Sequence, residues 1–330
     1  MKQLFLSAVT FLLMLFLLFC FVLSATAIQD KRILIGTASK GGIYYPLGSA
    51  ISEVINKYCS GFKALPEVST GLSENIKKLG EGNIEMGISY SDMSYFAYNG
   101  MERYKNSPIV SLRSLFALGE FQPFQIFTLV DSDIKTIHDF RGKHIGMGLQ
   151  GSTGETEGKK VLEFYDLDYE SIQPVFISNN EAVKAFKDGT IDAFMHRGPL
   201  HSSFLIELTN AIKVRMIPVN VPDEFFKKYP YYIAQVIPKK TYKNINYDVQ
   251  TTAVRMNMLT SIKLGLTKDD IYQILQIIWK HEKKWTSAHT AFKNKISFKD
   301  AILGLGVPLH PGAVKFYKEK GFSIPENLLP

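Results

Sequence analysis

The segment Ile33-Leu-Ile-Gly-Thr-Ala-Ser-Lys-Gly-Gly-Ile-Tyr-Tyr-Pro-Leu-Gly-Ser-Ala-Ile-Ser-Glu-Val-Ile-Asn-Lys-Tyr58 decides the fold class. It opens with three apolar residues, passes through a loop of small residues, and continues with apolar residues at helical spacing from Leu47 to Ile55. This pattern predicts a strand, a loop and a helix. Because the first N–H groups of a helix have no partner within it, a carboxylate or phosphate is the natural guest of such a loop.

The same loop does not match the loop that holds nucleotide triphosphates. A P-loop requires Gly-x4-Gly-Lys-Ser/Thr, in which the lysine reaches the terminal phosphates and the hydroxyl holds magnesium. Gly36 and Gly41 have the required spacing, but Gly42 and Ile43 occupy the lysine and hydroxyl positions. We therefore expect no nucleotide triphosphate chemistry here.

Short strands and helices alternate along the rest of the chain. We predict strands at 62–69, 86–89, 144–147, 174–177 and 191–195, and helices at 73–80, 155–165, 182–187 and 269–284. This alternation favours parallel sheets covered by helices on both faces. The stretch 112–130 is extended and carries Pro123 near its middle, so it is predicted to be a long strand, broken there, that passes between two domains.

The N-terminus has the pattern of an export signal. Lys2 is the only charged residue before Asp30, residues 4–23 are almost wholly apolar, and Ala25-Thr-Ala27 fits the small-x-small cleavage pattern. We predict that residues 1–27 are a signal peptide, cleaved after Ala27, and that the mature chain is periplasmic. A run of this length could also remain as an uncleaved anchor. Cys20 is a poor lipidation site, because the bulky Phe19 precedes it.

Composition indicates which kinds of partner the mature chain has. The net charge of +7 falls by one when Lys2 leaves with the leader, and the remaining excess of basic residues is spread along the sequence. We expect a solvated basic surface and no nucleic-acid partner. Only Cys59 remains after cleavage, so the exported chain has no intramolecular disulfide and depends on core packing. We expect a monomer.

Several short motifs then follow one another in a characteristic order. They are Gly36-Thr37, Gly41-Gly42, Tyr44-Tyr45-Pro46, Gly48, Ser69-Thr70-Gly71-x-Ser73-x-Asn75, Ser91-Asp92, Gly142-Lys143, Gly151-Ser152-Thr153, Asp188-Gly-x-Ile-Asp192-Ala193, Gly198-Pro199 and Leu309-His310-Pro311-Gly312-Ala313. In this combination they resemble the TAXI family, the solute receptors of one class of TRAP transporters. The resemblance covers nearly the whole chain after the leader.

The predicted fold class is α/β, a type II periplasmic binding protein with two α/β domains and a ligand cleft between them. We assign 28–122 and 220–330 to the first domain and 123–219 to a second domain inserted into it. The resemblance implies a receptor without a cofactor. It would capture a small organic anion, an amino acid or dicarboxylate such as glutamate or 2-oxoglutarate, and deliver it to TRAP membrane subunits.

The candidate binding residues are polar or aromatic and lie mostly where a strand turns into a helix. They are Ser39, Tyr44, Tyr45, Thr70, Asn75, Ser91, Asp92, Ser152, Thr153 and Arg197. Ligands of open α/β sheets collect at the carboxyl edge of the sheet, where such turns lie. The family usually carries Gly-Ser-Gly-Thr where this chain has Gly-Ser-Thr-Gly, so either Ser152 or Thr153 could be the donor.

Some of these residues have a structural alternative. Asp92 either neutralises a ligand ammonium or caps the helix that follows it. One of Tyr44 and Tyr45 is expected to pack into the core, while the other offers a flat wall and a phenol hydroxyl. Arg197 suits a bidentate contact with a carboxylate, although the family does not reliably carry arginine there. Ser73, in the same loop as Thr70, is a candidate N-cap.

Motifs for other chemistries are weak or missing. Gly146-Met-Gly148-Leu-Gln-Gly151 has the form of a dinucleotide fingerprint, but the next predicted strand ends in Ser178-Asn179 instead of the ribose-binding acid. The sequence contains neither Gly-x-Ser-x-Gly nor His-Glu-x-x-His. We expect His196 and His201 to be surface residues without a metal, and His310 to be structural.

Two other classes of function remain open at this stage. An enzyme could use the same bilobal scaffold, since such folds host both binding and catalysis, and an acid–base pair facing the cleft would favour it. A surface-anchored interaction protein would require the leader to be retained. The catalogue of motifs favours the solute receptor.

Overall fold

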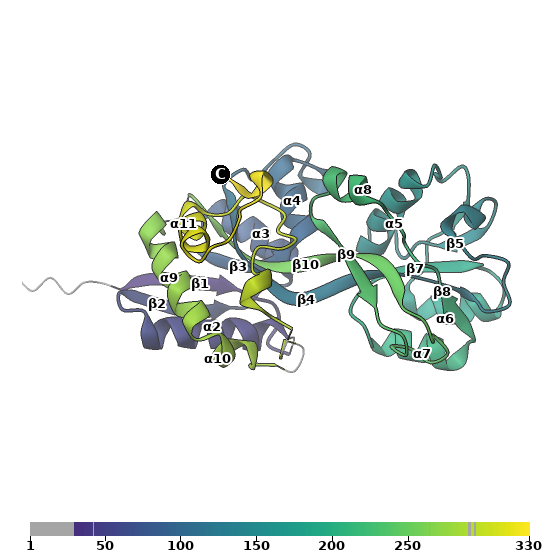
Figure 1. Ribbon diagram of the computed structural model, residues 1–330, viewed down its shortest axis with the longest axis horizontal. Helices are drawn as coiled ribbons and strands as arrows, with labels where there is room; N and C mark the ends of the chain where they lie inside the picture. The colour runs from purple at the N-terminus through teal and green to yellow at the C-terminus, as the bar shows by residue number, and fades with distance from the viewer. Residues whose placement is uncertain (1–29, 42, 264, 290–291, 294) are drawn as a thin grey trace, which may run out of the picture.

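The computed structural model describes residues 30–41, 43–263, 265–289, 292–293 and 295–330. The molecule is elongated, with two lobes side by side along its long axis (Figure 1). The predicted leader and its cleavage site lie outside these residues. Within the described ranges, no helix combines the length and the apolar character needed to cross a bilayer.

The first lobe is built on three strands that run parallel to one another, with β1 in the middle. They are β1 (Lys31–Gly36), β2 (Phe62–Glu67) and β3 (Met86–Tyr90). The helices of this lobe are α2 (Tyr44–Tyr58), α3 (Leu72–Glu81), α4 (Ser91–Asn99), α9 (Lys268–Lys280), α10 (Glu282–Thr286) and α11 (Pro311–Glu319), with 3-10 turns η1 (Glu102–Tyr104), η3 (Phe298–Asp300) and η4 (Glu326–Leu328).

The second lobe repeats the arrangement with its own parallel strands, and here β5 lies in the middle. They are β5 (His144–Gly146), β6 (Gln173–Val175) and β7 (Ala193–Arg197). The other elements are η2 (Ile137–Phe140), α5 (Thr153–Phe164), α6 (Asn179–Lys187), α7 (Ser203–Ala211), β8 (Val214–Met216) and α8 (Asp223–Lys228).

Two long strands join the lobes. β4 (Leu112–Leu129) pairs with β10 (Val249–Ser261) through its first part and with β7 and β8 through its second part. The strand order is β2-β1-β3-β10-β4-β7-β5-β6, with β9 (Tyr232–Ile237) added to β10. β10 and β4 run antiparallel to their neighbours. The predicted α/β class is confirmed, but the sheet is mixed because these strands connect two parallel sets.

Apolar burial follows the predicted periodicity. Ile33 and Ile35 of β1 pack against Leu47 and Ile51 of α2 in one large core of the first lobe. A separate core in the second lobe includes Phe194. Ile237, Ile245 and Val249, from the end of β9 to the start of β10, join that second core. The assignment of residues to two domains stays a prediction, and this packing favours adding the β9–β10 connection to the second one.

The predicted helix at 269–284 is in fact two helices. α9 ends at Lys280, and His281 has φ −112° and ψ 27°, outside the helical region, before α10 begins at Glu282. The break lets Trp285 turn into the core, where its indole Nε1–H donates to the carbonyl oxygen of Ile278 at 2.9 Å. Apolar spacing alone did not reveal this turn, because both helices carry buried apolar residues.

His310 has the structural role that the sequence suggested. It is the N-cap of α11, and its Nδ1 accepts a hydrogen bond from the backbone N–H of Gly312 at 3.1 Å. The side chain is buried, and burial, together with the nearby Arg113 charge, lowers the pKa of His310 to about 4. The imidazole must be neutral to accept this bond.

This cap should make stability depend on pH. The pKa is lower in the folded state than the ordinary value near 6.5, so the contribution is complete above about pH 6.5 and is lost as the pH falls toward 4. His310→Asn keeps a capping oxygen that does not titrate. We expect the free energy of unfolding of the wild type to drop by on the order of 2–3 kcal/mol more than that of the variant across this range. Urea unfolding at a series of pH values measures the difference; equal pH profiles would contradict the assignment.

Candidate functional site

Three helix N-termini meet at one edge of the second lobe. Strands β5, β6 and β7 are parallel, so their carboxyl ends lie on the same side. Just beyond them α5, α6 and α7 begin, with the N-caps Ser152, Ser178 and Ser202. Unpaired N–H groups and the helix dipole favour negative charge at such ends. This edge is therefore suited to an anion.

Local sequence explains why the helices begin there. The Ser152 hydroxyl accepts a hydrogen bond from the backbone N–H of Glu155 at 3.2 Å. Ser178 and Glu181 form a reciprocal capping box at the start of α6. Gly148 has φ +82°, and a Cβ at this position would lie 2.9 Å from the Ser152 oxygen, so only glycine fits the turn from β5 into α5.

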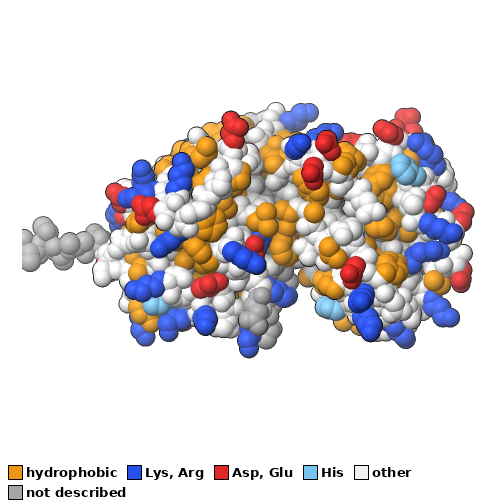
Figure 2. All heavy atoms as spheres, in the orientation of Figure 1, with side chains coloured by type: hydrophobic (Ala, Val, Ile, Leu, Met, Phe, Trp, Pro, Cys, Tyr) orange, Lys and Arg blue, Asp and Glu red, His pale blue; other side chains and the backbone are white. Residues whose placement is uncertain are grey.

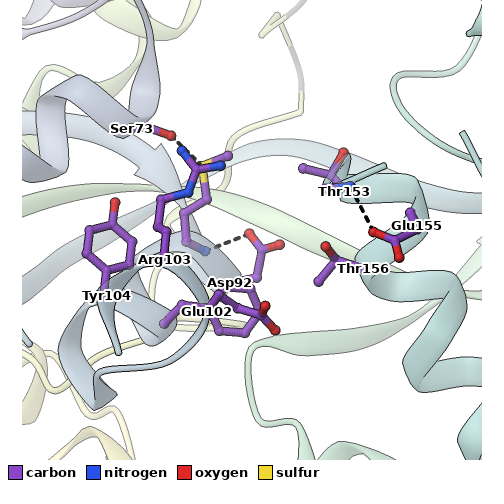
Figure 3. A pocket seen from close by; sticks show the side chains of 11 residues that line it. Ser73, Asp92, Glu102, Arg103, Tyr104, Thr153, Glu155 and Thr156 are labelled. Atoms are coloured by element: carbon purple, nitrogen blue, oxygen red, sulfur yellow. Dashed lines mark hydrogen bonds between the residues drawn. The ribbon is translucent and has the colours of Figure 1, made fainter. Parts of the chain in front are cut away.

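Three cavities lie at this edge, and we call them together the interlobe cleft because residues of the first lobe line two of them. One of about 350 Å³ is lined by Ser152, Thr153 and Asn179, among others. A second of about 360 Å³ adds Tyr90 of the first lobe and Ser202. The third, of about 260 Å³, lies between residues 92–104 of the first lobe and the start of α5 (Figure 3). Thr153 lines all three cavities.

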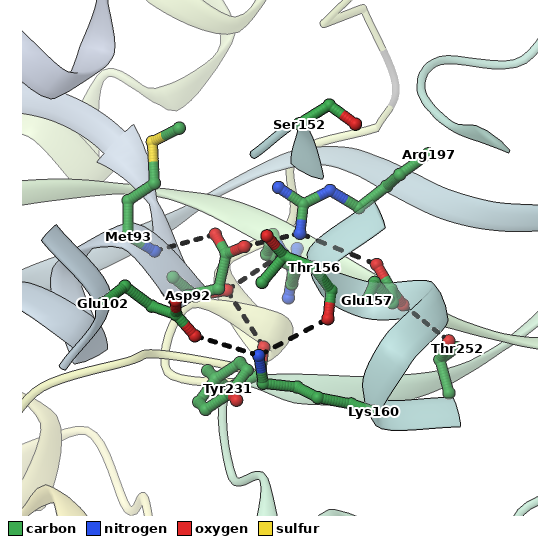
Figure 4. Close-up of polar contacts among 12 residues, drawn as sticks. Asp92, Met93, Glu102, Ser152, Thr156, Glu157, Lys160, Arg197, Tyr231 and Thr252 are labelled. Atoms are coloured by element: carbon green, nitrogen blue, oxygen red, sulfur yellow. Dashed lines mark hydrogen bonds and ion pairs between the residues drawn. The ribbon is translucent and has the colours of Figure 1, made fainter. Parts of the chain in front are cut away.

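A buried ion pair connects the lobes across the cleft. Arg197, at the end of β7, donates from Nη1 to Oδ2 of Asp92, in the first turn of α4, at 2.5 Å (Figure 4). The two side chains are 2% and 3% exposed, so water screens neither charge. Asp92 lines the cavity of about 260 Å³ and Arg197 the other two.

A second carboxylate shares the same guanidinium. Oε2 of Glu157 on α5 lies 3.6 Å from Nη1 of Arg197, and its Oε1 accepts a hydrogen bond from the Thr252 hydroxyl at 2.7 Å. Burial raises the pKa of Glu157 to about 7, although Arg197 and the Thr252 hydroxyl act in the opposite direction. Burial lowers the pKa of Arg197, but Asp92 and Glu157 outweigh it, so that pKa is raised overall.

Neutral polar side chains complete the surroundings. Burial raises the pKa of Tyr231 and of Tyr232, so both hydroxyls stay protonated. Burial and the Arg197 charge lower the pKa of His196 to about 4. Several buried atoms of the described residues have no hydrogen-bond partner: Nη2 of Arg197, Oε2 of Glu157, Nε2 of His196, and the hydroxyl oxygens of Ser202, Tyr231 and Tyr232. Such atoms are where bonds from a ligand or water are expected.

Four of the predicted binding residues lie in the cleft: Asp92, Ser152, Thr153 and Arg197. Asp92 and Arg197 contact each other, an arrangement that neither of their predicted roles included. Asp92 also accepts a hydrogen bond from the backbone N–H of Met93, at the start of α4, at 2.8 Å.

Two other predicted residues form hydrogen bonds with backbone carbonyl oxygens and are buried. The amide of Asn75 donates to the carbonyl oxygens of Thr37 and Ile88, and the residue is fully buried. Ser91 donates to the carbonyl oxygen of Tyr231 and is equally inaccessible. Both residues hold strands and loops together and line none of the three cavities.

The remaining predicted residues lie outside the three cavities too. Thr70 is exposed and donates its hydroxyl to Glu74 at 2.6 Å, and Ser39 is exposed in the first loop. Tyr44 and Tyr45 are half-buried at the start of α2. The Tyr44 hydroxyl lies 3.2 Å from that of Tyr90, which lines the cleft.

Two expectations about single residues were wrong. Ser73 is not an N-cap, because α3 begins one residue earlier with Gly71 as its cap, and Ser73 instead lines the cavity of about 260 Å³. His196 is not at the surface, since it is only 9% exposed and its ring packs edge-on against Phe204. No group of His, Cys, Asp and Glu side chains suitable for a metal occurs among the described residues.

The sequence reasoning missed part of the cleft. Asn179 and Ser202, which line the cleft, were not predicted to be binding residues, and neither were Glu157 and Tyr231, which are buried near Arg197. Ser178 and Ser202 each precede a helix, so a search for serine N-caps after strands would have found the edge. Glu157 gave no comparable signal, because a glutamate in a polar helix is ordinarily exposed.

Comparisons with known proteins agree with this architecture. The sequence pattern of the NMT1-like family matches residues 35–321. Among solved structures, the periplasmic sulfonate-binding protein SsuA from Methylobacillus flagellatus is 13% identical, with a TM-score of 0.51 over 88% of this chain and 85% of that one. A TctC solute-binding protein from Polaromonas is 14% identical, with a TM-score of 0.51 over 82% and 88%.

The Asp92–Arg197 pair should be strongly coupled in stability. Arg197→Gln leaves the charged Asp92 without its cation in a dry site, and we expect it to cost about 3–5 kcal/mol in the free energy of unfolding. With Asp92→Asn already present, the same change should cost less, because that stranded charge is gone. Urea unfolding of the two single variants and the double variant measures the coupling.

The exposed pair Lys184–Asp188, at 3.3 Å, is the matched control. Its coupling, measured with Lys184→Gln and Asp188→Asn, should stay below about 0.5 kcal/mol, since surface pairs are screened by water. Equal coupling in the two cycles would mean that the interlobe pair is not desolvated in solution.

Proposed function

Because the chain belongs to the NMT1-like family, whose model matches residues 35–321, we propose that it is an exported receptor for a small organic anion. It has the fold of periplasmic solute-binding proteins, which have two lobes. On this proposal the ligand binds in the interlobe cleft and the protein delivers it to TRAP membrane subunits. The leader is removed after Ala27, and the receptor works in the periplasm as a monomer without a cofactor.

One observation carries this proposal. The N-termini of α5, α6 and α7 converge on cavities that a buried arginine also lines. All of these groups attract or donate to an anion, and the first lobe lines two of the cavities from the other side through Tyr90 and Asp92. Neutral hydroxyls and backbone N–H groups can orient the ligand through hydrogen bonds without burying another charge.

The ligand is proposed to be an amino acid or a dicarboxylate. The motif resemblance to TAXI receptors points to glutamate or 2-oxoglutarate, and cavities of about 260–360 Å³ suit molecules of this size. The similarity to a sulfonate-binding protein adds alkanesulfonates as a second kind of anion to test. Both groups would be recognised at the same helix N-termini.

An enzyme on this scaffold is the rival interpretation. Such an enzyme would present an acid–base pair to the cleft. Glu157, whose pKa burial raises to about 7, lines none of the three cavities of the cleft, and His196 has its pKa lowered to about 4. Both observations favour binding without covalent chemistry.

Native mass spectrometry of the purified protein tests the proposal directly. We expect a mass increment from a co-purified small anion that disappears after unfolding and refolding. Calorimetry with L-glutamate, 2-oxoglutarate and ethanesulfonate then ranks the candidates. Turnover of any bound metabolite into a product would instead support the enzyme.

The Thr153 side chain should contribute directly to affinity, since it is the one residue common to the three cavities. Thr153→Val keeps the shape and removes the hydroxyl, and we expect about a tenfold loss of affinity, as for one hydrogen bond to a charged group. Thr209→Val is the control, because that hydroxyl donates to Leu205 inside α7. Calorimetry with the ligand found above measures both, and unchanged binding by Thr153→Val would move the site elsewhere.

A further inference from the structure

One guanidinium between the lobes serves two carboxylates. Arg197 and Glu157 both belong to the second lobe, on β7 and α5, whereas Asp92 belongs to the first lobe (Figure 4). The same atom, Nη1 of Arg197, lies 2.5 Å from Asp92 and 3.6 Å from Glu157. The first distance is a hydrogen bond and the second is not. With the lobes in contact, Arg197 is therefore bonded to Asp92.

This leaves Glu157 without adequate compensation for a negative charge. Its side chain is 0% exposed, and Oε2 has no hydrogen-bond partner in the described part of the chain. The hydroxyl of Thr252, which donates to Oε1 of Glu157, is neutral. The other nearby cation, Lys160, lies 3.4 Å from Glu102 and so is already paired. An uncompensated buried carboxylate costs several kcal/mol, which protonation avoids.

Separation of the lobes changes this balance. Asp92 moves away with α4, while Arg197 and Glu157 stay together in the second lobe. The guanidinium then has one carboxylate partner instead of two, and Glu157 can keep its charge. If the lobes came back into contact, Arg197 would again be hydrogen-bonded to Asp92 and not to Glu157.

We propose that closure of the two lobes takes up one proton on Glu157, so that the receptor closes more readily at acidic pH. This inference rests on the proposed function, in which the lobes close on a ligand. The closed receptor holds Asp92 and Arg197 as a neutral pair beside a neutral Glu157. The open receptor holds Arg197 and Glu157 as the pair and exposes Asp92.

The surrounding groups leave Glu157 as the residue that titrates near neutrality. Those that face the cluster are Asp92 on α4, His196 and Arg197 on β7, Tyr232 at the start of β9 with Tyr231 just before it, and Lys160 on α5 (Figure 4). Burial raises the pKa of both tyrosines and, together with the Arg197 charge, lowers that of His196 to about 4. The pKa of Glu157 is raised to about 7 with the lobes in contact.

The sign of the effect follows. Since the pKa of Glu157 is higher in the closed arrangement than when Arg197 serves it alone, the closed state binds more protons. Lowering the pH from about 8 to about 5 therefore shifts the lobes toward closure. His196 has the opposite effect, because its lowered pKa means that the buried imidazole loses a proton. This effect is confined to about pH 4 to 6.5, below the pH range in which Glu157 titrates.

The test needs no ligand. Carbon-13 NMR of protein labelled at the glutamate carboxyl should show one resonance that titrates well above the rest, and this resonance should be absent from Glu157→Gln. Asp92→Asn frees Arg197 for Glu157, and the midpoint should fall by about one pH unit or more. Glu163→Gln, an exposed glutamate on the same helix, should leave the resonance in place. Equal midpoints in the wild type and Asp92→Asn would overturn the proposal.

Small-angle scattering supplies an independent readout. The radius of gyration of the wild type should increase as the pH rises from about 5 to about 8, whereas that of Glu157→Gln should stay constant. A pH-independent radius in the wild type would exclude proton-linked closure. It would leave the proposed anion receptor intact, because ligand binding is measured separately.

Discussion

The continuous pairing of β4 with β10 is the constraint on which the rest of the molecule depends. Both strands run through the middle of the protein, and β4 reaches from β10 in the first lobe to β7 and β8 in the second. The ladder is interrupted between Arg255 and Met256 and between Met258 and Leu259. Such bulges bend and twist a strand without breaking it. The lobes are thus joined by two paired strands, and we expect this pairing to confine their relative motion.

That constraint also places the cleft. The carboxyl end of β3 leads into Ser91 and Asp92, and the carboxyl end of β7 is Arg197 itself. Because β4 and β10 hold the two parallel sets in one sheet, these ends lie close enough for a direct ion pair. Open α/β sheets bind ligands at such carboxyl edges. Here two edges, one from each lobe, face the same cavities.

Regular apolar spacing in the sequence predicted most strands and helices. The sequence did not predict residues whose environment differs from the usual one for their type. The strand–loop–helix of 33–58 and the later alternation come from regular apolar spacing, which tertiary structure did not override. The binding role predicted for Asn75 stays a prediction, because an amide after a strand suits either a ligand or buried carbonyls, and in the structure it donates to two carbonyl oxygens. Glu157 was missed because its burial depends on β7, β9 and β10, which are distant in the sequence.

The ion pair between Arg197 and Asp92 determines how the cleft can attract an anion. Since Asp92 offsets its charge, the guanidinium adds little net attraction for an anion, though its unpartnered Nη2 can still give one directed hydrogen bond. The attraction must then come mainly from the N-termini of α5, α6 and α7 and from their hydroxyls. Fixed dipoles of this kind need no counter-ion, and all three belong to the second lobe. On the proposed function, an anion would therefore bind to the second lobe first. The contacts of Arg197 with Asp92 and Glu157 would then depend on whether the first lobe has closed over the anion.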